Sequence, residues 1–358
     1  MQQIETELIQ IDALQPQQQL IQRAAILIQQ GKLVVFPTET VYGLGANALE
    51  VTAVTEIFAA KGRPYSDPLI VHIAELAQLE QLVTAIPTEA RKLAEAFWPG
   101  PLTLVLPAHP RVPRQVTAGM ETVAIRMPRH AVALALIRAA GVPVAAPSAN
   151  RFMHVSPTTA QHAFADLHGR VPLILDAGPC EVGVESTVLD LCAETPIILR
   201  PGGTSLEALR TVLPSVQPPR PRALQANTQH EGEKFKSPGQ MLTHYAPAVP
   251  ALLVTGSEEQ IRAGMLAETR RRQARGERVG LLIAEEDAAM FQQNGTALYI
   301  LGSTRTPETV AARLFAGLRT LEESGVDVIL CRDFAQEGIG LAIHDRLLKA
   351  TGGNAIQP

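Results

Sequence analysis

A proline-rich, polar stretch between Leu213 and Gly239 divides this sequence into two unequal parts. It contains five prolines, few large apolar residues and a polar run from Gln225 to Lys236. That composition is typical of a linker and not of a packed element. At 358 residues the chain is also long enough for two domains. We therefore predict a first domain over residues 1–212, a linker over 213–249 and a second domain over 250–358.

The part after the linker has a regular pattern. Short apolar runs near 251–254, 279–284, 297–301 and 326–331 alternate with helical patterns that begin near Ser257 and at 285–294, 307–323 and 340–350. Strands that alternate with helices pair in parallel, because each helix returns the chain to the same edge of the sheet. This part is therefore predicted to be a small Rossmann-like parallel α/β domain.

Before the linker, the apolar runs lie closer together. They occur at 33–36, 69–73, 102–106, 123–127, 173–175, 187–191 and 197–199, among helical patterns at 16–31, 53–60, 88–96 and 131–140. Some neighbouring runs leave no room for a helical crossover, so the strands cannot all be parallel. We predict an α/β domain with an open, twisted, mixed sheet covered by helices.

Composition excludes several classes of protein. The 31 Lys and Arg against 35 Asp and Glu argue against binding of a polyanion through the whole surface. The N-terminus lacks the pattern of a signal peptide, and no apolar run is long enough to span a bilayer, so we expect a cytoplasmic protein without membrane contact. The three cysteines have no metal-binding spacing and are predicted to be buried thiols.

Lys61 and Arg63 form the densest pair of cations. Pro64 disfavours the α conformation at Arg63, so we predict an extended pair whose side chains point to one side. Two convergent cations suit a phosphate group. The alternative is a solvated helix end with two surface cations.

Other polar residues follow predicted strands. Arg126 and Arg200 each end an apolar run, and strand ends are where open sheets bind ligands, although a rim arginine paired with a carboxylate is an equal alternative. Ser148 and Asn150 also follow a short apolar run, as turn residues often do. The sequence has no GxxxxGK[ST] phosphate loop and no complete GxGxxG motif, which makes a dinucleotide unlikely as ligand.

Several ordered motifs together resemble the YrdC-like threonylcarbamoyl-AMP synthases. They are Phe36–Gly45, Lys61-x-Arg63-Pro64, Pro68–His72, Trp98–Thr103, Ser148-x-Asn150 and Glu185–Val188. Ser237-Pro238-Gly239, with His244–Pro247 and a second α/β domain behind them, looks like the two-domain branch of this family.

The resemblance implies a nucleotidyltransferase that converts L-threonine, bicarbonate and ATP into threonylcarbamoyl-AMP and pyrophosphate. ATP would be a substrate, with Mg²⁺, and no tightly bound cofactor is expected; a resident metal site is not indicated either way. The product would pass to a downstream tRNA threonylcarbamoyl transferase complex. Whether the protein binds tRNA directly is left open.

The resemblance also implies roles for individual residues. The expected catalytic residues are Lys61, Arg63, Ser148 and Asn150. The expected threonine contacts are Thr40, His72, Arg126, Ser148 and Ser186. The expected ATP contacts are Lys61, Arg63, Asp67, Thr122, Asn150, Ser156, Arg200 and Tyr245, the last in the linker.

Asp67 departs from the family pattern, which usually has Asn before Pro-Leu-Ile-Val-His. A carboxylate there would weaken ATP binding unless a cation offsets it. Two other functions fit parts of the pattern: a non-catalytic RNA-binding module on the same basic concave surface, and a carbamoyl-transfer domain of the hydrogenase-maturation type. The acidic net charge speaks against the first, and the absence of paired CxxC motifs against the second.

Overall fold

The computed structural model describes residues 4–220, 238–239, 245–292 and 295–358. The chain forms two compact units. Unit 1 comprises 1–152, 157–181 and 185–240, and unit 2 comprises 153–156, 182–184 and 241–358. Most of the predicted linker, including Ser237 and His244, lies outside the described residues.

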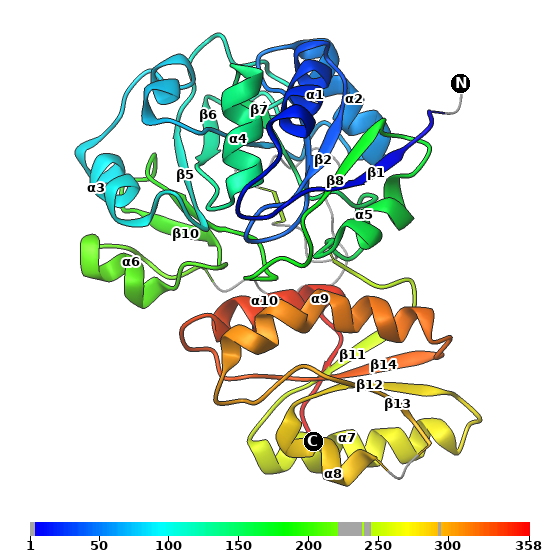
Figure 1. The fold of residues 1–358 in the computed structure, drawn as a ribbon. Coiled ribbons are helices and arrows are strands. Elements are labelled where there is room, and N and C mark those ends of the chain that lie inside the picture. Colours follow the sequence, from blue (N-terminus) through cyan, green and yellow to red (C-terminus); the bar gives the residue numbers. More distant parts are fainter. Residues whose placement is uncertain (1–3, 221–237, 240–244, 293–294) are drawn as a thin grey trace. The chain divides into compact units, whose positions relative to one another are not determined.

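Unit 1 contains a ten-stranded mixed sheet with the order β1-β8-β2-β3-β7-β4-β6-β5-β9-β10 (Figure 1). The mixed pairing confirms the expectation drawn from the short spacings. The strands are β1 Glu7–Gln10, β2 Val34–Phe36, β3 Gly43–Asn47, β4 Ile70–His72, β5 Leu102–Pro107, β6 Thr122–Arg126, β7 Val144–Ala145, β8 Leu173–Asp176, β9 Thr187–Asp190 and β10 Ile197–Arg200.

Helices cover both faces of this sheet. Successive side chains of β2 point to opposite faces of the sheet. Val34 and Phe36 belong to one hydrophobic cluster, and Val35 belongs to the cluster on the other face. The Val34 cluster includes buried residues of α1 and α4, and the Val35 cluster includes those of α2 and α3. The helices are α1 Gln18–Gln29, α2 Val51–Lys61, η1 Leu76–Gln81, α3 Thr88–Phe97, α4 Ala131–Ala140, α5 Ala160–Leu167 and α6 Leu206–Val212.

Unit 2 contains the predicted parallel sheet, with the order β13-β12-β14-β11-β15. Figure 1 shows α7 and α8 on one face and α9 and α10 on the other. The strands are β11 Ala251–Val254, β12 Val279–Ile283, β13 Ala297–Ile300, β14 Val328–Arg332 and β15 Ala355–Ile356. The helices are α7 Glu258–Gln273, η2 Glu285–Asp287, α8 Ala288–Phe291, α9 Pro307–Glu323 and α10 Gly340–Ala350.

Strand β3 is the main element that the sequence patterns did not predict. Its segment reads Gly-Leu-Gly-Ala-Asn, and glycines disfavour strands. The tertiary structure requires them, since a Cβ at Gly45 would lie 2.6 Å from Cε1 of Phe36 on the paired strand. Strand β1 and helix α5 were also not predicted.

Unit 2 includes two short segments that precede the predicted linker, 153–156 and 182–184. Ala246 donates a backbone hydrogen bond to the carbonyl of Met153 (3.0 Å). Gly183 allows close packing on α9, because a Cβ there would lie 2.4 Å from the carbonyl oxygen of Ala311. The predicted limits 1–212 and 250–358 remain a prediction, but the chain contributes to unit 2 at more places than a single linker implies.

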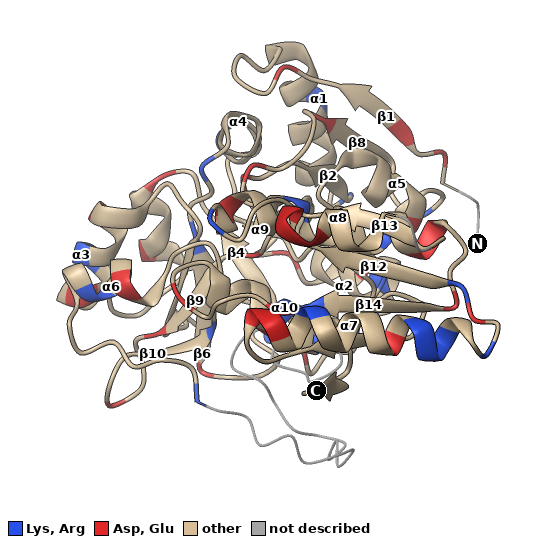
Figure 2. Ribbon diagram, turned by 90° about the horizontal axis from the view of Figure 1, so that it is seen from below, with Lys and Arg blue, Asp and Glu red and all other residues tan. Residues whose placement is uncertain are grey.

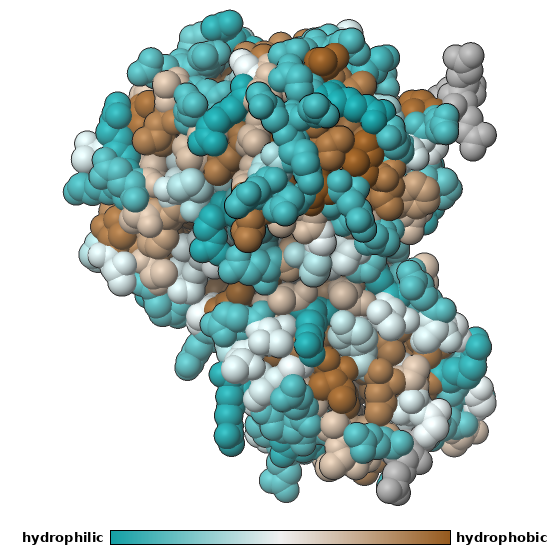
Figure 3. All heavy atoms as spheres, in the orientation of Figure 1, coloured by the Kyte–Doolittle hydropathy of each residue, from teal (hydrophilic) through white to brown (hydrophobic). Residues whose placement is uncertain are grey.

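The surface carries charges of both signs. Figure 2 shows acidic and basic segments along α7, which begins with Glu258 and Glu259 and ends with Arg270, Arg271 and Arg272. On the face in Figure 3, hydrophobic residues form separate patches among hydrophilic ones. Within the described ranges, no helix is both long and apolar enough to cross a membrane. Cys180 and Cys331 are buried, but Cys192 is exposed, so the prediction of three buried thiols was wrong for this one.

Candidate active site

Lys61 is the last residue of α2, and it is only 3% exposed. The prediction of an extended Lys61-x-Arg63 pair was therefore wrong. Gly62 ends the helix in the left-handed conformation (φ 66°), which glycine adopts without strain. Arg63 is also buried, so the alternative of two solvated surface cations is excluded as well.

The Lys61 ammonium group binds the loop after β7. Its Nζ donates to the carbonyl oxygens of Ser148 and Asn150 (both 2.6 Å) and to Asn150 Oδ1 (3.1 Å). Ser148 Oγ donates to the same Oδ1 (2.6 Å). Burial and the nearby Arg63 lower the pKa of Lys61. Three of the expected catalytic residues, two buried and Ser148 half-buried, thus form one hydrogen-bonded group.

Arg63 is held by the turn that precedes β4. Its guanidinium donates to the carbonyl oxygens of Asp67 (3.1 Å) and Pro68 (2.7 Å), and its Nη2 lies 2.9 Å from Asp67 Oδ2. Each contact fixes the plane of the guanidinium, as expected for a group that must present donors in a defined direction.

Asp67 lies among the expected phosphate-binding cations. Burial raises the pKa of this carboxyl group, and the positive charges of Arg63, Lys61 and Arg200 oppose that shift. Of these three, Arg63 is in direct contact with the carboxylate through the ion pair. The negative charge that the family pattern lacks is offset here by protein cations.

Arg126 ends β6, as predicted, and it is 3% exposed. Its Nη1 donates to Thr40 Oγ1 (2.8 Å) and its Nε to the carbonyl oxygen of Gly100 (3.2 Å). Its Nη2 lies 2.7 Å from Oε1 of Glu39, which is also buried. The loop after β2 thus brings a hydroxyl and a carboxylate to this arginine.

His72 ends β4 beside Arg126, since the two residues are in register in the parallel pair β4·β6. Burial, and next the charge of Arg126, lower the pKa of His72 to about 3. The imidazole is therefore neutral at physiological pH and can bind a ligand only by neutral hydrogen bonds.

Arg200 ends β10, again as predicted, and Ser186 directly precedes β9. Arg200 donates through Nε and Nη2 to the carbonyl oxygen of Ser186 (3.2 and 2.9 Å), and Nη2 also donates to Ser186 Oγ (3.2 Å). Ser186 Oγ lies 2.7 Å from Thr103 Oγ1. Ser186, an expected threonine contact, and Arg200, an expected ATP contact, are therefore neighbours.

Three expected ATP contacts are not joined to these groups by the contacts described. Thr122 begins β6, at the opposite end of the strand from Arg126. Ser156 is fully buried in the segment that groups with unit 2. Tyr245 is 1% exposed within unit 2, where its ring lies 5.5 Å from that of Phe315 and the Arg346 guanidinium lies 5.1 Å from its centre. The roles of these three residues remain predictions.

The sequence patterns missed Glu39 as a site residue. It lies inside the Phe36–Gly45 motif, but a single carboxylate in a turn has no spacing that marks it. Its partner Arg126 is far away in sequence, so only the fold reveals the pair.

In the described part of the chain, no group of three or more His, Cys, Asp or Glu side chains is placed to hold a metal ion.

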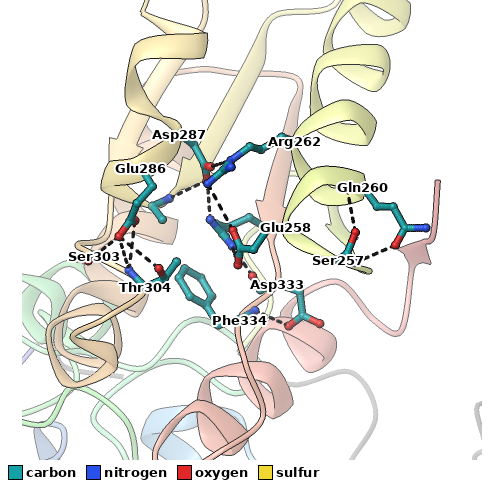
Figure 4. A network of polar contacts seen from close by, with 12 residues as sticks. Ser257, Glu258, Gln260, Arg262, Glu286, Asp287, Ser303, Thr304, Asp333 and Phe334 are labelled. Atoms are coloured by element: carbon teal, nitrogen blue, oxygen red, sulfur yellow. Dashed lines mark hydrogen bonds and ion pairs between the residues drawn. The ribbon is translucent and has the colours of Figure 1, made fainter.

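Unit 2 has a polar network of its own at the carboxyl ends of its strands (Figure 4). Arg332, fully buried at the end of β14, contacts Asp287 (2.7 Å) and Glu258 (2.6 Å). Asp287 also accepts from Arg262 (2.8 Å), and Asp333 contacts His344 (2.8 Å). These cations and carboxylates neutralise one another within the protein.

Comparison with known families agrees with this arrangement. Residues 26–202 match a family model described as "Telomere recombination", named for Sua5, YciO and YrdC proteins. Residues 204–352 match the model "Threonylcarbamoyl-AMP synthase, C-terminal domain". The two matches together cover most of the chain, on both sides of the predicted linker.

Individual relatives are similar over nearly their whole length. The threonylcarbamoyl-AMP synthase of Bacillus subtilis is 46% identical over 94% of both chains. That of Pyrococcus abyssi is 44% identical, over 94% of this chain and 95% of its own. The crystal structure of P. abyssi Sua5 with L-threonine covers 98% of this chain and 99% of its own, with 42% identity and a TM-score of 0.91.

Proposed function

This chain belongs to the threonylcarbamoyl-AMP synthase family, and we propose that it transfers the adenylyl group of ATP to a carbamate formed from L-threonine and bicarbonate. The family membership confirms the catalytic interpretation of the sequence over the RNA-binding one. One observation carries the proposed chemistry: the guanidinium groups of Arg63 and Arg200 are both buried and are held mainly by main-chain carbonyl oxygens. A site with this much buried positive charge suits a polyphosphate.

The reaction has two steps. Bicarbonate takes up a proton from the ammonium group of threonine and loses water to give CO₂. The neutral amine then forms a C–N bond with CO₂, and a second proton leaves to give the carbamate. A carbamate oxygen then attacks the α-phosphorus of ATP, and the bond to the bridging oxygen breaks to release pyrophosphate. Charge develops on the α-phosphate and on the leaving group, so preorganised cations contribute more than a general base.

In this proposal the residues divide into two groups. Lys61 keeps the Ser148–Asn150 loop in place, because its three described hydrogen bonds all go to that loop. Arg63 and Arg200, both held by main-chain carbonyl oxygens, stabilise the phosphates. Arg126, Thr40 and neutral His72 form the threonine side, and Ser186 lies beside Arg200.

Magnesium would enter this site with ATP. The described residues offer Asp67 as a carboxylate close to the phosphate-binding cations, but no preformed group of metal ligands. A cation bound to the phosphates with most of its water retained suits the chemistry of Mg²⁺. We further propose that the product serves a downstream enzyme that threonylcarbamoylates tRNA, since a mixed anhydride with AMP is an activated donor.

The test is pyrophosphate release from ATP by the purified full-length protein. We expect release that requires both L-threonine and bicarbonate, with L-serine as the control amino acid. Formation of threonylcarbamoyl-AMP should be followed by mass spectrometry in the same samples. Pyrophosphate release without dependence on threonine would contradict the proposed substrate, and binding of ATP without any release would contradict the proposed reaction.

A further inference from the structure

The loop after β2 holds a buried carboxylate that the proposed reaction has not yet used. Glu39 is 2% exposed, and within the described ranges neither of its carboxylate oxygens accepts a hydrogen bond. Arg126 Nη2 lies 2.7 Å from Glu39 Oε1, yet it also makes no aligned hydrogen bond. The pair is thus in charge contact, with hydrogen-bonding capacity unused on both sides.

Such an arrangement is costly unless a ligand completes it. Buried charged groups without hydrogen bonds lose their hydration and regain little of it from one ion contact. The other contacts of Arg126 are satisfied, since Nη1 and Nε donate to Thr40 and Gly100. The unused capacity is therefore confined to Nη2 and to the Glu39 carboxylate.

We propose that Glu39 binds the α-amino group of the amino-acid substrate while Arg126 binds its carboxylate. This inference rests on the proposed function, because it assumes an amino-acid substrate. A free amino acid is a zwitterion whose two charges are joined through one carbon atom. Arg126 and Glu39 form a neighbouring pair of opposite charges that matches it, and their net neutrality matches its net charge.

Two titratable groups lie near Glu39, but neither of them occupies the hydrogen-bonding capacity of its carboxylate. Its charge also acts on two nearby groups: burial lowers the pKa of His130 and Glu39 opposes this, while burial and then Glu39 raise the pKa of the Cys180 thiol. Neither group donates a hydrogen bond to Glu39. A substrate ammonium group would supply such donors. After it has given one proton to bicarbonate, the neutral amine still has N–H groups to donate to Glu39, which would orient the nitrogen that forms the new C–N bond.

The experiment measures binding by isothermal titration calorimetry with the full-length protein. The ligands are L-threonine, L-2-aminobutyrate, which lacks the hydroxyl group, and (2S,3R)-2,3-dihydroxybutanoate, which has a hydroxyl in place of the amine. The wild type should bind the amine-free ligand about 10- to 100-fold more weakly than L-threonine, as expected for a hydrogen bond between charged groups. Equal affinity would overturn the proposal without any variant.

The variant Glu39→Gln keeps the size of the side chain and removes its charge. It should weaken L-threonine and L-2-aminobutyrate to a similar degree and leave the amine-free ligand unchanged. Equal loss for all three ligands would show that Glu39 only positions Arg126, and a loss confined to L-threonine would show that it reads the hydroxyl group. Either result, or no loss at all, overturns the proposal.

Two further variants of this protein serve as controls. Glu181→Gln removes an exposed carboxylate paired with Arg129 and should bind all three ligands like the wild type. Glu39→Asp retains the charge if Glu39→Gln does not fold, and it should keep the preference for amine-bearing ligands. If the wild type neither binds L-threonine nor releases pyrophosphate, the proposed function fails, whereas failure of the Glu39 tests alone leaves that function intact.

Discussion

The two units treat buried charge in opposite ways. In unit 2, Arg332 lies between two carboxylates, Asp287 and Glu258. The charged groups of this network, shown in Figure 4, are paired with one another. In unit 1, Lys61, Arg63 and Arg200 donate mainly to carbonyl oxygens, which hold them in place without neutralising them, and Arg63 is also paired with Asp67.

The difference teaches how to distinguish a binding site from a structural network. The carboxyl edge of the unit 2 sheet is where open α/β sheets commonly bind ligands. Here that edge is filled by the protein's own ion pairs. In unit 1, Arg200 is held by a main-chain carbonyl oxygen and keeps its charge for a ligand, and Glu39 keeps its hydrogen-bonding capacity. The fold alone would suggest a ligand site in either unit. The pairing of the buried charges is what distinguishes the candidate site in unit 1 from the structural network in unit 2.

The largest effect should come from Arg63→Ala. Loss of a preorganised cation in the phosphate site should lower kcat/KM for threonine-dependent pyrophosphate release by about 10³-fold at a temperature where the variant is folded. Because Arg63 is also the ion-pair partner of buried Asp67, the variant should lose thermal stability as well. Steady-state kinetics and differential scanning calorimetry measure the two effects. Arg23→Ala, which removes an exposed arginine paired with Glu7, is the matched control. Turnover close to that of the wild type would remove Arg63 from the phosphate site.

Arg332→Ala should lower stability without a selective loss of turnover. Removing the cation leaves Asp287 and Glu258 without their central partner, which should destabilise the protein by about 3 kcal/mol. Turnover at a temperature where the variant is folded should stay near that of the wild type. Chemical denaturation gives the stability, and Arg278→Ala, from an exposed pair with Asp327, is the control. A selective loss of turnover would show that the unit 2 network serves the reaction.

Two histidines should give stability opposite dependences on pH. The pKa of His72 is lowered to about 3, so the unfolded state binds more protons as the pH falls below about 6.5. Stability should then fall by up to about 1.4 kcal/mol per pH unit, and His72→Gln should reduce this slope.

Burial alone would lower the pKa of His344, but the hydrogen bond and charge of Asp333 raise it. The His344 contribution should therefore be complete below about pH 6.5 and decline as the pH rises through its raised native pKa. His344→Gln should cost more stability at pH 6 than at pH 9. Urea denaturation of both variants across this range measures the slopes. Slopes of the same sign for the two histidines would contradict the contrast between the units.

The smallest effect should come from Asp67→Asn, which restores the residue typical of the family. Removing a negative charge among three cations should lower the KM for ATP by about 3- to 10-fold. Because burial raises the pKa of Asp67, wild-type stability should fall as the pH rises through that pKa, and the variant should lack this loss. A higher KM for ATP would show that the carboxylate supports nucleotide binding, for example through Mg²⁺.

Local patterns in the sequence predicted a large share of the fold. The alternation after residue 250 gave the parallel sheet of unit 2, because strand and helix periodicities are local properties of the chain. The positions of Arg126 and Arg200 at strand ends followed from apolar runs that stop at an arginine. The extended Lys61-x-Arg63 pair was wrong because the effect of Pro64 reaches only its neighbour, and Gly62 ends a helix that includes Lys61.

The sequence by itself determined many of the elements, the parallel sheet after residue 250 and the residue types available for phosphate and amino-acid binding. The tertiary structure alone decided which charges meet: Arg63 with Asp67, Arg126 with Glu39, and Arg332 with Asp287. It also explains the glycines of β3, a residue type that is uncommon in strands. At Gly45 the ring of Phe36 occupies the space that a side chain would need. The physical reason is that periodicity and turn preference act over a few residues, whereas ion pairing and burial depend on segments that meet only after folding.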